Sequence, residues 1–203
     1  GSEMCIRDRG KTVTITAYGT NNLTSSGAYA AIQKNGSGKL VLTSTTKGTI
    51  NATAGNNATY GAAGIGSQYN MPVDGIRISE NADVTAIGAN GAAGIGSGAN
   101  ADAANIEIAG GIVNATAGSG TIGSKNIGGA GIGSGSDVEA TEIKVTGGVV
   151  KKATGGTDAA GVGSGANAKV SYIMISGGTV TAVGGANGAG IGSGLAGAAS
   201  DIY

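Results

Sequence analysis

The sequence predicts an all-β chain folded as a parallel β-solenoid (β-helix), with about three short strands in each coil of about 30 residues. Three observations lead to this prediction. A Gly-Ile-Gly-Ser signature recurs along the chain, an Ile-x-Ile pattern keeps step with it, and glycine pairs separate the short apolar segments. A unit of about 30 residues buries too little apolar surface to fold alone, so we expect neighbouring units to stack.

Composition argues against collagen and against disorder, two other states that are common among glycine-rich chains. Glycine supplies 43 of the 203 residues and proline only one, whereas collagen needs glycine at every third position and abundant proline. The 40% share of hydrophobic residues argues against disorder. Twelve basic and twelve acidic residues give no net charge and no basic surface for nucleic acid. No apolar stretch approaches the roughly 18 residues that span a bilayer, so we expect no membrane insertion.

The first element of each repeat is the Gly-Ile-Gly-Ser signature, which occurs five times. Equivalent residues in a parallel stack lie about 4.8 Å apart, so its apolar residues are expected to form one inward ladder. These residues are Ile65, Ile95, Ile132, Val162 and Ile191.

The serines of the same signature invite a catalytic interpretation. They are Ser67, Ser97, Ser134, Ser164 and Ser193. A nucleophilic serine needs a general base, and the chain contains no histidine and no Ser-x-x-Lys motif at these positions. We therefore expect a structural ladder of hydroxyl groups, bonded to turns or to the next coil, and we predict that the chain is not an enzyme.

The second element is the apolar-x-apolar pattern of a strand with one buried face. It reads Ile76-Arg77-Ile78, Ile106-Glu107-Ile108, Ile143-Lys144-Val145 and Ile173-Met174-Ile175. Two glycines follow in three copies, and Glu80-Asn81 stands there in the other copy. Asparagine is the best substitute for glycine at positive φ, so this site is expected to be a tight left-handed bend. A third strand follows, centred on Val84, Val113, Val150 and Val180.

The repeats divide the chain into three parts. Residues 61–203 are expected to be regular solenoid repeats with a looped-out insertion at 121–127, and residues 10–60 degenerate N-terminal coils. Asp201-Ile202-Tyr203 falls where the next Ile-x-Ile strand begins, so we expect the repeat array to be truncated there. Residues 1–9 differ: Gly1-Ser2 resembles a cloning scar, and the following segment, with the single cysteine Cys5, resembles a translated sequencing adapter.

Few residues suggest a ligand site. The acidic residues are scattered, whereas calcium requires several clustered oxygen ligands, so we expect no cofactor and keep calcium between coils as a minor alternative. The candidate glycan contacts are Tyr29, Tyr60, Tyr69 and Tyr172. They occupy different repeat positions and therefore predict no regular aromatic platform. Thr12, Thr14 and Thr16 could begin a flat threonine array of the kind ice binders use, but charged residues such as Arg77 and Lys144 occupy the equivalent strand position in later repeats.

The motif Ile-x-Ile-x-Gly-Gly-x-Val, with Gly-Ala-Gly-Ile-Gly-Ser-Gly, resembles a glycine-rich β-helix repeat of large secreted and cell-surface proteins of gut bacteria. The resemblance covers residues ~11–203, nearly the whole chain. It implies a structural or adhesive role outside a bacterial cell, or alternatively carbohydrate binding, with glycans or a host or cell-wall surface as partners. Exposed coil ends carry unpaired strand edges, so end-to-end self-association is also expected.

Overall fold

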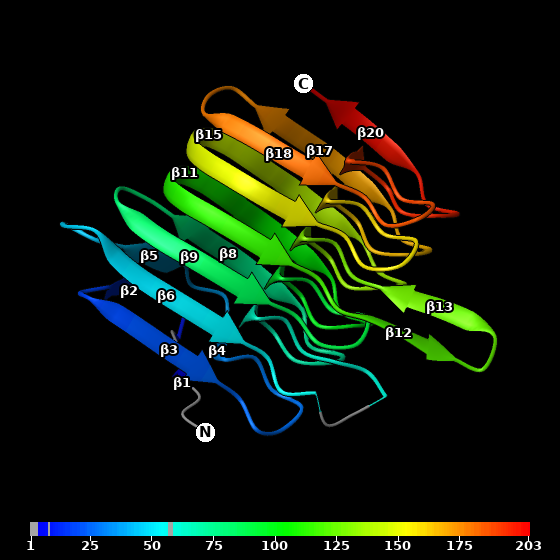
Figure 1. The fold of residues 1–203 in the computed structure, drawn as a ribbon, viewed down its shortest axis with the longest axis horizontal. Helices are drawn as coiled ribbons and strands as arrows, with labels where there is room; N and C mark the ends of the chain where they lie inside the picture. The colour runs from blue at the N-terminus through cyan, green and yellow to red at the C-terminus, as the bar shows by residue number, and fades with distance from the viewer. Residues whose placement is uncertain (1–3, 8, 57–58) are drawn as a thin grey trace.

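The computed structural model describes residues 4–7, 9–56 and 59–203. These residues form an all-β parallel solenoid of about six turns, which confirms the predicted fold class. Each turn contributes one strand to each of three ladders, and the ladders form the three sides of the stack (Figure 1). None of the described residues form a helix with the length and hydrophobicity of a membrane span.

The first ladder is a 7-stranded sheet built on the Gly-Ile-Gly-Ser signature. Its strands are β1 (Met4–Arg7), β4 (Ile32–Asn35), β7 (Ile65–Gly66), β10 (Ile95–Gly96), β14 (Ile132–Gly133), β16 (Val162–Gly163) and β19 (Ile191–Gly192). The apolar residues of neighbouring strands pair in register, from Ile32 through Ile65 to Ile191. Most of these strands hold only two residues, because glycine follows the apolar residue and the chain turns again at once.

The second ladder carries the Ile-x-Ile pattern. Its strands are β2 (Val13–Thr16), β5 (Leu40–Thr43), β8 (Val73–Ile78), β11 (Ala103–Thr116), β15 (Ala140–Thr154), β17 (Val170–Ile175) and β20 (Ala199–Ile202). Leu40 pairs with Ile76, and Ile173 pairs with Ile202, so the degenerate coils and the C-terminal segment both join the ladder as predicted.

The third ladder contains β3 (Thr20–Thr24), β6 (Gly48–Thr53), β9 (Ala82–Ile87) and β18 (Thr179–Val183), together with the second halves of β11 and β15. In those two long strands the backbone pairing continues around the bend that separates the second ladder from the third. Gly111, Gly148 and Gly178 hold positive φ at this bend, as expected. In the remaining copy Glu80 (φ 54°) takes the left-handed conformation, so the expectation for Asn81 was wrong by one residue.

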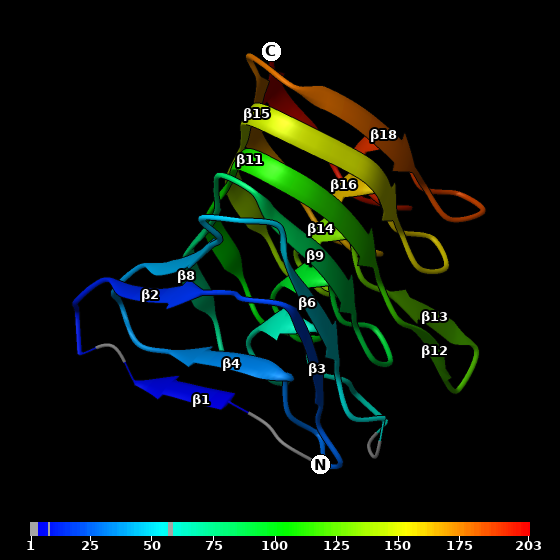
Figure 2. The same cartoon turned by 60° about the vertical axis from the view of Figure 1, so that its left-hand side comes forward.

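The insertion is a small antiparallel hairpin of β12 (Ser119–Ile122) and β13 (Lys125–Gly128). It projects from the side of the stack (Figure 2). Ile127 at its base is fully buried, and Asn126 donates a 2.8 Å hydrogen bond to Asp158, which ties the hairpin to the next coil. The predicted insertion is therefore confirmed. The structure adds that its two strands, β12 and β13, pair with each other.

The core is one continuous column of small and β-branched side chains, since the chain has no Phe or Trp. In the four central coils, Ile65, Ile95, Ile132 and Val162 are fully buried, and Ile191 in the last coil is partly buried. Inward residues alternate with outward ones in the Ile-x-Ile segments of β8, β11 and β15 and along β6 and β9. This alternation leaves two outward-facing sheet surfaces on which functional side chains are displayed.

Candidate functional site

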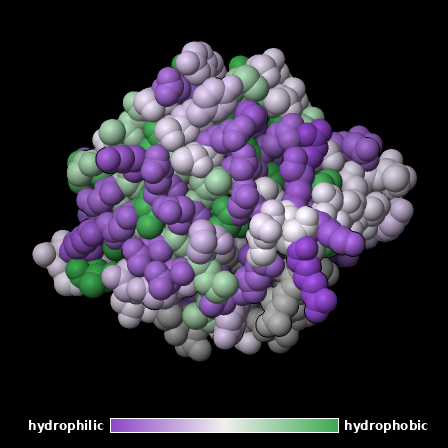
Figure 3. Space-filling model, turned by 180° about the vertical axis from the view of Figure 1, so that it is seen from behind, coloured by the Kyte–Doolittle hydropathy of each residue, from purple (hydrophilic) through white to green (hydrophobic). Residues whose placement is uncertain are grey.

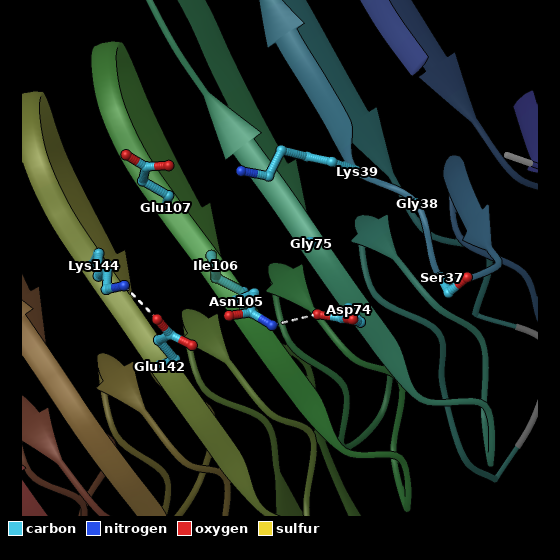
Figure 4. Close-up of a pocket in the computed structure, with 10 residues that line it drawn as sticks. All are labelled: Ser37, Gly38, Lys39, Asp74, Gly75, Asn105, Ile106, Glu107, Glu142 and Lys144. Carbon is cyan, nitrogen blue, oxygen red and sulfur yellow. Dashed lines mark hydrogen bonds and ion pairs between the residues drawn. The ribbon is translucent and has the colours of Figure 1, made fainter. Parts of the chain in front are cut away.

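The outward surface of the second ladder contains three adjoining hollows, which we call together the outer groove. The central hollow has a volume of ≈ 310 Å³, and Figure 4 labels the ten residues that line it. It shares Ser37 and Asp74 with a hollow of ≈ 340 Å³ on one side. It shares Glu142 and Lys144 with a hollow of ≈ 310 Å³ on the other side. The groove therefore crosses five strands, from β5 to β17, which span about 19 Å at the usual spacing.

A glycine, Gly75, is among the residues that line the central hollow. The residue directly before each Ile-x-Ile pattern has positive φ, and these residues are Gly75, Asn105, Glu142, Tyr172 and Asp201. Four of them carry side chains, whereas Gly75 carries none and lies next to Gly38 of the preceding coil. A Cβ atom at Gly75 would lie 3.2 Å from the carbonyl oxygen of Gly38, so the glycine permits a close approach of the two coils where the hollow is lined by Asp74 and Asn105.

Charged and amide groups of the groove pair across neighbouring coils or within one. Asn105 donates a 2.6 Å hydrogen bond to Asp74 Oδ1, and Lys144 forms an ion pair with Glu142 (Figure 4). Arg77 forms a further ion pair with Glu107. Hydrophilic residues cover much of the surface seen from this side (Figure 3). Such paired, partly exposed groups can exchange these contacts for hydrogen bonds to a polar ligand at small cost.

Lys144 is the cation that lines the third hollow, the one that shares Glu142 and Lys144 with the central hollow. Its hydrogen bond to Glu142 raises the pKa of Lys144 above its usual range, and the nearby charge of Glu142 adds to this effect. The ammonium group is therefore protonated at neutral pH. Its Nζ atom also lies 5.7 Å from the ring centroid of Tyr172, within the range of a cation–π contact.

The structure separates the four tyrosines that the sequence suggested as glycan contacts. Tyr172 lines the third hollow of the outer groove. Tyr60 and Tyr69 stack on each other, with ring centroids 4.6 Å apart, and neither is among the residues that line the three hollows. Tyr29 is 46% exposed and lines none of the three hollows. Of the four, only Tyr172 shares a site with charged and amide groups.

The repeated serines lie inside the stack. Ser67, Ser97 and Ser134 each accept a hydrogen bond from the backbone of the next coil, at 3.2, 3.0 and 3.3 Å. Ser134 and Ser164 also donate to a carbonyl four residues ahead, at 3.0 and 2.7 Å. Ser193 is partly buried in the last described signature. These hydroxyl groups connect successive coils, and no substrate could reach the four that are fully buried.

No group of three or more Cys, Asp or Glu residues within the described ranges is arranged to hold a metal ion. The acidic groups nearest one another in the groove, Asp74, Glu107 and Glu142, each have an amide or cationic partner. The arrangement offers hydrogen bonds, charge and one aromatic ring, which is the chemistry of a binding surface.

Sequence reasoning missed most of the groove residues, including Lys39, Asp74 and Asn105. They lie at the beginnings of three different strands, β5, β8 and β11, so no linear sequence motif contains all three. One signal was present: the residue before each Ile-x-Ile pattern is Gly, Asn, Glu, Tyr and Asp in turn, a set in which glycine alone has no side chain. Aligning the repeats by that position would have indicated a depression at Gly75.

A protein-family model described as a Beta helix repeat matches residues 76–99 and 173–195. Both matched segments begin at an Ile-x-Ile strand and end just after the next Gly-Ile-Gly-Ser signature, so each covers most of one coil, in the same phase. No curated protein and no solved structure matches the chain. The matches therefore agree with the repeat unit and leave its ligand open.

Proposed function

We propose that this chain is a structural and adhesive segment of a bacterial surface or secreted protein. The observation that supports this role is the uniform stack: the in-register residues of each coil serve the fold, whereas the outward residues change from coil to coil. Such a stack holds its outward surfaces on a rigid support whose length grows with the number of coils. The whole surface is then available for contact with a cell wall or host surface.

A second candidate role is carbohydrate binding, and the outer groove favours it. Its length of about 19 Å suits an extended chain of several sugar units, since its three adjoining hollows follow one another across five coils. Asp74, Asn105 and Lys144 offer hydrogen bonds to sugar hydroxyl groups, and the Tyr172 ring offers an apolar face.

A glycan array separates these two roles. If the groove binds carbohydrate, we expect saturable binding that Tyr172→Asn and Asn105→Gly each weaken about fivefold, because each removes roughly 1 kcal/mol of contact. Both replacements occur naturally at the equivalent position of another coil, so the left-handed backbone tolerates them. Lys169→Ala, an exposed change outside the groove, is the matched control. A purely structural and adhesive role predicts no saturable glycan binding, and binding that only the groove variants weaken would contradict it.

A further inference from the structure

The outward surface of the third ladder differs from the outer groove in shape and chemistry. Strands β3, β6, β9, β11, β15 and β18 lie side by side in one layer (Figure 1). Their inward residues are buried, so their alternate residues face solvent. We call this outward surface the threonine face.

Two outward rows of mostly β-branched residues cross the threonine face in register. The row between them contains Asn22, Asn51, Thr85, Asn114 and Lys152, and Lys151 adjoins it at a register shift. The distal row contains Thr24, Thr53, Ile87, Thr116, Thr154 and Val183. The proximal row, four residues earlier on most of the strands, contains Thr20, Thr49, Asp83, Ile112, Val149 and Thr179. All but Asp83 are Thr, Ile or Val. Ile87 and Val183 are 41% and 42% exposed, so the methyl groups of this surface face water.

These rows form a rigid two-dimensional array. Neighbouring strands lie about 4.8 Å apart, and outward residues on one strand repeat about every 6.6 Å. β-Branched side chains are stiff at χ1, and the paired backbone fixes their origins, so the hydroxyl and methyl groups hold their spacing before any ligand arrives. A ligand that fits such an array must itself be flat and periodic.

The chemistry of the distal row narrows the choice of ligand. The row carries no charge, and the charged residues of the face, Asp83, Lys151 and Lys152, lie outside it. It contains no aromatic ring, and stacking of sugar rings on a flat surface depends on such rings. The face measures about 24 Å by 13 Å, so two copies face to face would bury only about 600 Å², well below the 1,200 Å² or more of a stable interface.

We propose that the threonine face binds ice. Ice is flat, uncharged and periodic, and each row presents side chains to it at a regular spacing of about 4.8 Å. Threonine hydroxyl groups donate and accept hydrogen bonds to lattice water, and the methyl groups beside them order the water between rows. This function goes beyond the structural and adhesive role and uses a different side of the stack from the outer groove. Asp83, Lys151 and Lys152 are charges that interrupt the array; Lys152 pairs with Asn114 in the middle of the face, and Lys151 is the extra residue at the register shift beside it.

Thermal hysteresis of the purified chain, measured on a single ice crystal, tests the proposal. We expect a gap between melting and freezing points together with faceted crystal growth. Thr116→Arg should reduce the gap to the level of buffer, because one long charged side chain lifts the surface off the lattice. Thr121→Arg, an exposed threonine in the hairpin, is the matched control and should leave the gap unchanged. The double variant Asp83→Thr and Lys152→Thr should widen it.

The proposal is overturned if the wild-type chain gives no larger gap than a non-binding globular protein at equal concentration, or if Thr116→Arg leaves the gap intact. Circular dichroism on every variant shows whether the fold is kept, and the double variant gives an independent reading if Thr116→Arg fails to fold. Sedimentation with crystalline cellulose that Thr116→Arg abolishes, or dimerisation that it abolishes, would assign the face to a polysaccharide solid or a second copy and would also overturn ice binding.

Discussion

Gly133→Ala is expected to unfold the stack, with a loss of more than about 4 kcal/mol in the free energy of unfolding. Gly133 holds φ +137°, a conformation that only glycine adopts readily. A Cβ atom there would lie 1.8 Å from the carbonyl oxygen of Gly163 in the next coil. That oxygen accepts the amide hydrogen bond of Ser134, so the coils would have to separate where they pair. Urea unfolding followed by circular dichroism measures the loss.

Gly123→Ala is the matched control for this prediction. Gly123 also has positive φ (+59°), but it lies at the hairpin tip, and nothing lies within 4 Å of a Cβ atom placed there. Only the backbone strain of a left-handed alanine remains, about 1–2 kcal/mol. Equal losses for the two variants would show that strain alone matters and that the close approach of successive coils does not.

A peptide of residues 61–90, one full coil, is expected to be disordered. Ile65 and Val73 donate their amide hydrogens to carbonyls of the following coil, and Ser79 donates to the preceding one. Removing both neighbours exposes these groups and uncovers the aliphatic column from above and below. Few bonds remain inside the coil: Ala63 N to Ser67 O at 2.9 Å closes a local turn, and Gly61 N to Asn90 O and Ala89 N to Ala62 O, at 2.6 and 3.0 Å, join its two ends. They do not repay the conformational entropy of about 30 ordered residues.

Far-ultraviolet circular dichroism of that peptide, recorded beside the whole chain, measures the difference. We expect a spectrum without a β-sheet minimum and without a cooperative thermal transition. A folded, cooperatively melting single coil would contradict the view that each coil depends on its neighbours.

The fold could be predicted because its determinants repeat along the chain. Ile95, Ile132 and Val162 must stack, since the same signature surrounds each of them and a single coil has no other way to bury them. The degenerate coil could also be placed, because Leu40-Val41-Leu42 keeps the alternation when the glycines are lost. At the bend formed by Glu80 and Asn81, residue preference favoured a positive φ at Asn81. The structure places the positive φ at Glu80, so residue preference alone did not identify the left-handed residue.

The binding surfaces could be predicted less well. A groove or a flat face depends on outward residues of several coils, and these vary while the inward ones repeat. Thr14 pairs with Val41 and Val41 pairs with Arg77 in the second ladder, so the threonine pattern that begins there stops at the next coil. The array continues instead from Thr24 and Thr53 on the third ladder. Finding which strands carry the threonine array required the pairing register between coils, which the sequence alone does not give.

Cysteine cross-linking between coils tests the parallel, in-register stack most directly. In a Cys5→Ser background, Thr85→Cys and Asn114→Cys place thiols on register partners of adjacent coils, about 4.8 Å apart at Cα and within disulfide range. Thr85→Cys with Ile112→Cys places them diagonally, about 8 Å apart and out of range. We predict rapid oxidation of the first pair and little of the second, read as a mobility shift in non-reducing gels. Failure of the first pair to form, or equal oxidation of both, would contradict the stacked-coil structure.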